Sequence, residues 1–144
     1  MKKIFILLFS LLLITACSST GMSYKERNAA YLEYINKHNI EALDRISTFT
    51  YQGWQSLTDE FLIIRTRVKD RYLIQLNGYC PDLSFANAIK INQGMGSTLV
   101  TKFDSISVIG AKQPKCYIKN IYPLSKEQVK EISAIGKSTS TNEE

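Results

Sequence analysis

The stretch FLIIRTRVKDRYLIQL, residues 61–76, decides the fold that this sequence predicts. Two runs within it, residues 61–68 and 72–76, alternate with the period of two that is typical of half-buried strands. The polar segment Lys69-Asp70-Arg71 between them has the composition of a turn. We therefore expect an antiparallel hairpin, with the rest of the domain built around it.

Short runs rich in Ile, Val, Thr, Phe and Tyr continue on both sides of the hairpin and predict further strands. Residues 81–88 have the composition of a short helix or turn, with Pro81 at a tolerated early position. Pro123 is expected to end the last strand. The additional strands are predicted over residues 46–55, with an interruption near Gly53-Trp54, over 99–109, as one bent strand or two, and over 116–122. Residues 89–91 are an optional further short strand.

Each end of the domain carries the spacing of a capping box, in which a serine and a residue three positions later satisfy the first N–H groups of a helix. At the N-terminal end the pair is Ser23 and Glu26, and at the C-terminal end it is Ser125 and Gln128. Gly136 is suited to end the second helix. The two helices are predicted over residues 24–38 and 126–135.

This order of elements predicts a mainly β (α+β) fold with an N-terminal helix and a short C-terminal helix. Three strands, a short helical link and two more strands are compatible with a small antiparallel β-barrel, including an OB-like one, and equally with a sandwich or a curled meander. We expect one globular domain over residues 23–136, with its β core at about 46–122. Residues 137–144 are expected to form a flexible tail.

The N-terminal segment has the pattern of a lipoprotein signal peptide over residues 1–16. Lys2 and Lys3 precede an apolar run, residues 4–14, and the small Ala16 lies directly before Cys17. The apolar run covers about 11 residues, whereas a membrane-spanning helix needs about 20. A plain secretory signal is the alternative, but the cysteine after Ala16 favours a lipoprotein with Cys17 as its lipidated first residue.

The lipid at Cys17 would anchor the domain to a bacterial membrane. Ser18 follows the cysteine, and in the enterobacterial sorting pattern that this resembles such a residue implies transfer to the outer membrane, with the domain on the periplasmic face. Residues 17–22 form the expected tether. Its reach is about 17 to 20 Å when extended, so the domain should lie close to the bilayer.

Length and charge limit the remaining classes of function. Removing residues 1–16 from the 144-residue chain leaves about 128 residues, enough for one domain. The net charge of +5 falls to about +3 when Lys2 and Lys3 are lost with the signal peptide, and no block of like charge occurs. We therefore expect no nucleic-acid partner.

Cys80 and Cys116 are the two cysteines that remain once Cys17 is assigned to lipid. In an oxidising periplasm a disulfide between them is the simplest expectation. The sequence has no C-x-x-C pair for redox chemistry, and its single histidine, His38, leaves a zinc site short of ligands. We therefore expect a structural disulfide and neither a metal nor another cofactor.

A group of planar cations and aromatic rings is the candidate ligand site. Arginine side chains stack on aromatic rings and bind anions, so this group suits an anionic or glycan ligand. The alternative is a solvated outer strand face beside core aromatics. Asp104, an acid in a strand-like run next to Phe103, is expected either to pair with one of the arginines or to mark a strand end. The other candidate residues are Trp54, Arg65, Arg67, Arg71 and Tyr72.

A catalytic set is not apparent from the sequence. His38 is the only imidazole and lies in the predicted N-terminal helix, so a hydrolase triad has no obvious members. Paired acids remain an alternative, although each candidate suits a turn or a strand end equally well. The candidates are Asp59, Glu60, Asp82 and Asp104.

Several short motifs resemble a proteobacterial family of small exported lipoproteins that is catalogued only as a domain of unknown function. The resemblance spans about residues 46–124, and the two cysteines match in context, which supports the disulfide. It implies no activity, cofactor or ligand. The motifs are Trp54-x-x-Leu57 with Asp59, Tyr72-Leu73-Ile74-x-Leu76, Cys80-Pro81-x-Leu83-x-x-Ala86, Phe103-Asp104-x-Ile106-x-Val108 and Cys116-x-Ile118-x-x-Ile121.

Together these observations predict an outer-membrane lipoprotein that acts as a non-enzymatic envelope interaction or accessory module. Its expected partners are the membrane, through Cys17, and an envelope protein or glycan. The alternatives are a hydrolase of envelope polymers and a protein that binds a small anionic or glycan ligand.

Overall fold

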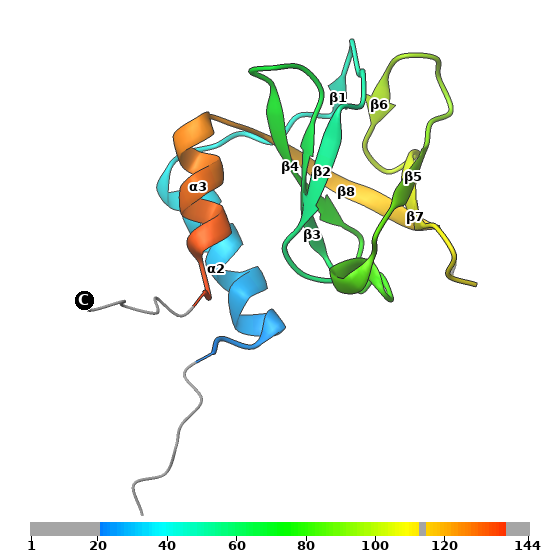
Figure 1. Cartoon of the computed structure of the whole chain (residues 1–144). Helices are drawn as coiled ribbons and strands as arrows, with labels where there is room; N and C mark the ends of the chain where they lie inside the picture. The colour runs from blue at the N-terminus through cyan, green and yellow to red at the C-terminus, as the bar shows by residue number, and fades with distance from the viewer. Residues whose placement is uncertain (1–20, 113–114, 138–144) are drawn as a thin grey trace, which may run out of the picture.

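The computed structural model describes residues 21–112 and 115–137. It confirms a mainly β fold with two helices, α2 (Tyr24–Lys37) and α3 (Lys126–Ala134), and a single short 3₁₀ turn, η1 (Leu83–Phe85), within these residues (Figure 1). The signal peptide, Cys17 and most of the tether lie outside the described residues, as does nearly all of the predicted tail. The strands are β1 (Arg45–Ile46), β2 (Gly53–Ser56), β3 (Phe61–Arg65), β4 (Arg71–Leu76), β5 (Ile89–Asn92), β6 (Leu99–Val100), β7 (Ser105–Val108) and β8 (Cys116–Leu124).

Six of these strands form one antiparallel sheet in the order β2-β3-β4-β8-β7-β5. The sheet curls into a half-barrel, and β2 and β5 are its two edges among the described strands. The short strands β1 and β6 pair separately. The predicted hairpin, β3 and β4, lies within the sheet with Ile63 opposite Leu73, so the central expectation of the sequence is confirmed.

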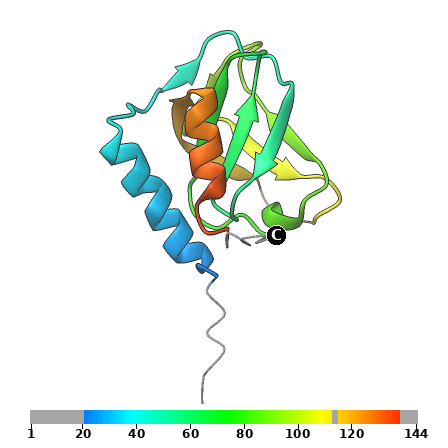
Figure 2. The same ribbon diagram turned by 60° about the vertical axis from the view of Figure 1, so that its left-hand side comes forward.

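The hairpin is buried on both of its faces. Leu62 and Ile64 point into an inner core, enclosed by the curled sheet together with residues from η1 and the β1–β6 pair. Phe61 and Ile63 point to the opposite face, into an outer core that α2 and α3 cover. Figure 2 shows both helices on this one side of the sheet. The two helices therefore provide the second layer that an antiparallel sheet needs to bury both faces.

The structure defines the bounds of the predicted strands, and it shortens the first strand of the hairpin. β3 ends at Arg65, because the Thr66 N–H donates to the Asp70 carbonyl at 3.1 Å and closes the turn early. Val68, predicted to lie on the apolar face, is 80% exposed in that turn. The strand expected over residues 46–55, with an interruption near Gly53-Trp54, is divided into β1 and β2. The run 99–109, expected to form one bent strand or two, contains the two strands β6 and β7.

The prediction that Pro123 ends the last strand is wrong, since β8 continues through it to Leu124. Pro123 lies opposite Tyr72 of β4. By that point β7 has already left the other edge of β8, where its pairing stops at Tyr117. A proline is tolerated there because no described strand needs its missing N–H on that side.

Both predicted capping boxes are present, with Ser23 and Ser125 each accepting a bond from the third residue of its helix. Tyr34 of α2 donates a hydrogen bond to the Glu131 carboxylate of α3, which ties the two helices together over the outer core. Burial, this hydrogen bond and the negative charge of Glu131 raise the pKa of Tyr34 to about 12. The neutral phenol is therefore favoured in the folded chain.

We expect the Tyr34→Phe variant to lose less stability than the wild type between about pH 10 and pH 12. The unfolded tyrosine ionises near pH 10, so the stabilisation from the raised pKa is present below that value and disappears as the pH rises through about 12. Urea unfolding at a series of pH values measures the difference. Glu131→Gln removes the accepting charge but keeps the burial of Tyr34, so its loss of stability should lie between those of the wild type and Tyr34→Phe. Parallel stability curves for all three proteins would contradict the assignment.

Candidate functional site

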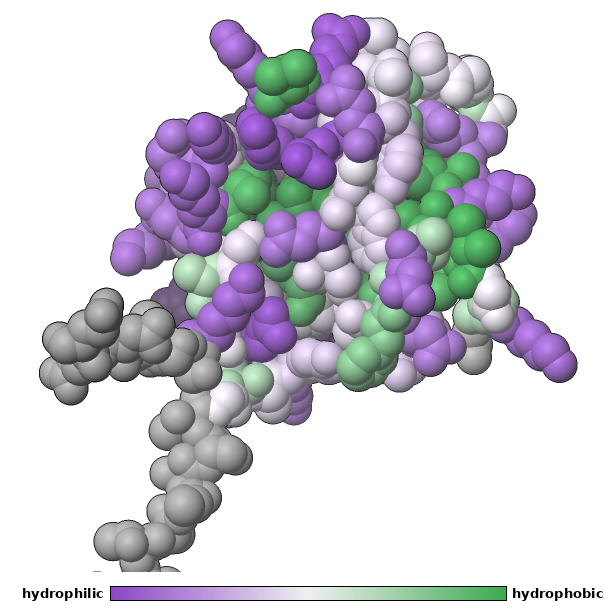
Figure 3. All heavy atoms as spheres, viewed as in Figure 1, coloured by the Kyte–Doolittle hydropathy of each residue, from purple (hydrophilic) through white to green (hydrophobic). Residues whose placement is uncertain are grey.

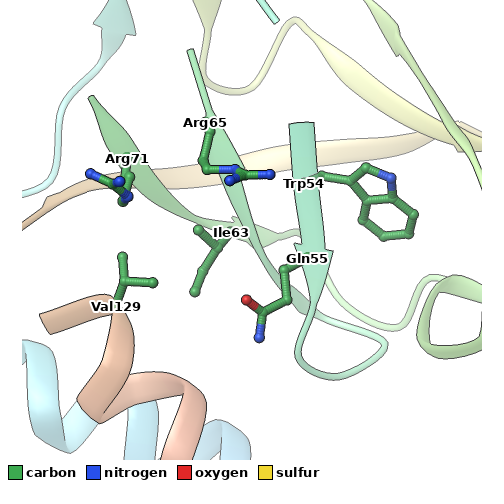
Figure 4. A pocket seen from close by; sticks show the side chains of 6 residues that line it. All are labelled: Trp54, Gln55, Ile63, Arg65, Arg71 and Val129. Atoms are coloured by element: carbon green, nitrogen blue, oxygen red, sulfur yellow. The ribbon is translucent and has the colours of Figure 1, made fainter. Parts of the chain in front are cut away.

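A shallow pocket of about 220 Å³ lies where the outer face of β2, β3 and β4 meets the start of α3. Its floor is apolar, formed by Ile63 of β3 and Val129 of α3. Arg65, Arg71 and Gln55 surround this floor (Figure 4). Trp54 completes the lining. Two of the three predicted arginines thus reach one pocket.

Arg65 and Arg71 are directly opposed in the register of β3 and β4. Like charges in such a pair repel each other, so the pairing costs stability unless an anion compensates it. Arg71 is half-buried and donates to the Lys69 carbonyl at 3.3 Å. Within residues 21–112 and 115–137, no acid forms a salt bridge with either guanidinium. Figure 4 shows them spread to either side of the apolar floor, Arg65 toward β2 and Arg71 away from it.

Gly53 allows the observed position of Arg65. A Cβ atom on this glycine would lie 2.9 Å from Nη2 of Arg65, closer than ordinary contact permits. The two residues are register partners on β2 and β3, so the Arg65 side chain crosses over the bare backbone of Gly53. The charge of Arg65 also opposes the rise that burial causes in the pKa of Tyr51.

The remaining members of the predicted group do not join the pocket through their side chains. The Trp54 indole packs against the inner core and points away from the pocket in Figure 4. Tyr72 packs against the same inner core, and burial raises its pKa. Arg67 is exposed in the β3–β4 turn. The pleat explains this result, since Trp54 and Tyr72 occupy the opposite parity from Arg65 and Arg71.

Asp104 serves as a backbone clamp and does not pair with the hairpin arginines. It is 2% exposed, and its carboxylate accepts the Gly94 N–H at 2.9 Å and the Val100 N–H at 2.6 Å. It directly precedes β7, which confirms the strand-end alternative. The neighbouring Phe103 is 80% exposed, beside a second, apolar pocket.

The other acids also have structural surroundings. The Asp59 carboxylate accepts hydrogen bonds from the backbone and hydroxyl of Ser84, which holds η1 against the start of β3. Glu60 lines a third pocket beside Asp59, whereas Asp82 is exposed with a left-handed φ of 63°. His38 caps the end of α2 and stacks on Tyr34 with ring centroids 4.0 Å apart. Of the candidate acids, only Asp59 and Glu60 therefore line one pocket together, and His38 is not part of it.

Metal-ligand clusters and membrane-spanning helices are both absent from the described residues. No cluster of three or more histidine, cysteine or acidic side chains suited to a metal occurs among them. None of the described helices has the length and apolar character to cross a bilayer.

Cys80 and Cys116 form the predicted disulfide, with their Cα atoms 5.7 Å apart. The bond connects the segment before η1 to the first residue of β8.

Sequence reasoning missed Gln55, Ile63, Val129 and the role of Gly53. Each depends on the register of β2 and β3 or on the docking of α3, which lies more than 60 positions away in the chain from β3. The predicted turn over residues 69–71 would have left Arg71 outside both strands, whereas Arg71 begins β4 opposite Arg65. No local pattern indicates that α3 supplies a wall of the pocket.

Comparison with known proteins gives one match. Neither a curated protein nor a solved structure matches the chain. The profile of a family of unknown function matches residues 1–138, which covers almost the whole chain. The chain therefore belongs to DUF6491, a family of unknown function.

Proposed function

We propose that this protein is a lipid-anchored outer-membrane protein whose domain faces the periplasm and acts as a binding module rather than an enzyme. The anchor is supported by the apolar run of residues 4–14, by the small Ala16 and by Cys17 directly after it. Three acyl chains on Cys17 would hold the domain stably, where one chain is marginal.

We further propose that the module binds an organic anion, and specifically a peptide carboxylate of an envelope glycan polymer, in the pocket between β3, β4 and α3. The observation that carries this proposal is the opposed pair of Arg65 and Arg71 with no acidic partner among the described residues. A carboxylate between or beside the guanidinium groups would relieve their repulsion and accept charge-assisted hydrogen bonds. The apolar floor of Ile63 and Val129 would contact the aliphatic part of the same ligand.

Binding of soluble peptidoglycan fragments with free peptide carboxylates tests the proposal. We expect Arg65→Gln and Arg71→Gln each to weaken binding by about tenfold or more, because each removes a charge-assisted hydrogen bond worth about 1.5 to 3 kcal/mol. Titration calorimetry on the full chain in detergent measures the affinities. Fragments whose carboxylates have been amidated should bind little to the wild type.

Two control variants separate this site from general positive charge. Lys69→Gln removes one charge from the exposed turn near Arg71 and should retain wild-type affinity. Gly53→Ala keeps every charge but displaces the Arg65 guanidinium, so it should weaken binding by less than Arg65→Gln does. Wild-type affinity in both arginine variants, or equal binding of amidated fragments, would overturn the carboxylate site.

A further inference from the structure

Four exposed apolar side chains gather at the end of the domain where the described chain begins. Met22 is 40% exposed, Tyr24 41%, Tyr79 68% and Phe85 81%. Lys25 adds one positive charge beside them. We call these five residues the tether-end patch.

Contacts within the fold bring these separate segments to one end. The Asn28 side chain accepts a hydrogen bond from Thr58 at 2.7 Å, which places the start of α2 beside the residues that precede β3. Tyr24, Lys25 and Tyr79 then line one pocket with Asp59.

Asp59 also connects this group to η1. Its backbone carbonyl accepts the Cys80 N–H at 2.8 Å, and its carboxylate holds Ser84, the residue before Phe85. Figures 1 and 2 both place η1 and the first turn of α2 at the same end of the molecule.

The β3–β4 turn lies at the opposite end of the same strands. Figure 3 shows mostly hydrophilic residues, with some hydrophobic atoms among them, at that upper end, and a mixture of hydrophilic, pale and light-green residues at the lower end. β3 runs from Phe61, next to the tether-end patch, to Arg65. Arg65 and Arg71 line the candidate ligand pocket described above, which we call the arginine pocket. At about 3.3 Å per residue, the strand separates the two ends by more than about 13 Å.

The chain length fixes what can cover the tether-end patch. Met22 is only five positions after Cys17, so a fully extended segment reaches about 17 to 20 Å. A bilayer that holds the acyl chains of Cys17 therefore lies next to the start of α2. Tyrosine side chains favour the interface between lipid and water, where an apolar body and a polar tip are both accommodated. The wholly apolar ring of a phenylalanine gains free energy when it leaves water for lipid.

We infer that the tether-end patch lies against the phospholipid surface that anchors the chain, so that the arginine pocket faces away from the bilayer. This inference rests on the proposed lipid anchor. Charge contributes little to the contact, because the acids Glu60 and Asp82 lie at the same end as Lys25. The orientation would present Arg65 and Arg71 to polymer in the periplasm.

Quenching of single tryptophans by brominated phospholipids tests this orientation. Trp54 is the only tryptophan, so Trp54→Phe gives a silent background in the full lipidated chain. Phe85→Trp then places a reporter in the tether-end patch, and Val68→Trp places one in the β3–β4 turn. The native side chains at the two sites are equally exposed, at 81% and 80%, so the pair is matched. Vesicles contain phosphatidylethanolamine and phosphatidylglycerol with bromine near the headgroup end of the acyl chains.

We expect the vesicles to quench the reporter at residue 85 at least about twofold more than the reporter at residue 68. Photoactivatable phospholipid with the wild-type chain gives a second measurement, in which cross-links should map to residues 77–88 and not to residues 66–70. Equal quenching of both reporters, or no quenching of vesicle-bound protein, would overturn the orientation and leave the anchor intact. Protein that lacks the acyl mass and does not float with vesicles would overturn both proposals.

Discussion

Replacing both Cys80 and Cys116 with serine is expected to lower the free energy of unfolding by about 3 to 4 kcal/mol. The two cysteines are 36 positions apart, and the bond between them removes conformational freedom from the unfolded chain. Cys80 is also 1% exposed in the inner core, so a serine there buries a hydroxyl among apolar side chains. A loss of this size is a large fraction of the stability of a small domain.

Urea unfolding of the double variant and of the wild type, with and without reductant, measures this loss. The reduced wild type should fall to nearly the stability of the double variant, and its mass should rise by that of two hydrogens. Alkylation of Cys80 in freshly prepared protein without reductant would contradict the disulfide. An unchanged midpoint after reduction would contradict its stabilising role.

The parts of the fold that sequence predicts well are those decided by neighbouring residues. The capping boxes at Ser23 and Ser125 depend on partners three positions away, and both are present. The β3–β4 hairpin depends on alternation and a short turn, and the hairpin is present, although its turn covers residues 66–70 and not the predicted 69–71. The disulfide is also recoverable, because only two cysteines remain for the described domain.

Other features depend on contacts between distant segments. Alternation in residues 61–68 predicts one buried face, yet α2 and α3 bury the second face as well. The turn hydrogen bond from Thr66 to Asp70 ends β3 before Val68, and no periodicity signals that choice. β2 and β5 form the two edges of the sheet. The curling of the sheet into a half-barrel depends on how far β7 pairs along β8.

The candidate site also combines residues that the sequence predicts correctly with residues whose position depends on the fold. Arg65 and Arg71 were predicted as members of a ligand site, and the structure places them together. Trp54 and Tyr72 were assigned to the same group because they are near in sequence, but the pleat directs them to the inner core. Proximity in sequence therefore identified the arginines that share a face and could not exclude aromatic residues on the other face.

Asp104→Ala is expected to destabilise the domain by about 3 to 5 kcal/mol. Its carboxylate accepts two backbone bonds, from Gly94 and Val100, and hydrogen bonds to a charged group contribute about 1.5 to 3 kcal/mol each. Alanine would leave both N–H groups without this acceptor in a site that is 2% exposed at Asp104. The segment before β6 and the start of β7 would lose their common attachment.

Two further variants distinguish this clamp from a ligand-binding or catalytic acid. Asp104→Asn keeps the shape and one oxygen acceptor, so it should lose about half as much stability as Asp104→Ala. Asp44→Ala is the matched control, because Asp44 holds the neighbouring Thr101 through its backbone carbonyl, at 2.9 Å, and its side chain is exposed. Urea unfolding should therefore rank the three losses as Asp104→Ala, then Asp104→Asn, then a near-zero change for Asp44→Ala. A stable Asp104→Ala protein that had lost ligand binding would show instead that the carboxylate acts on a ligand, because a structural acceptor cannot be removed without cost to the fold.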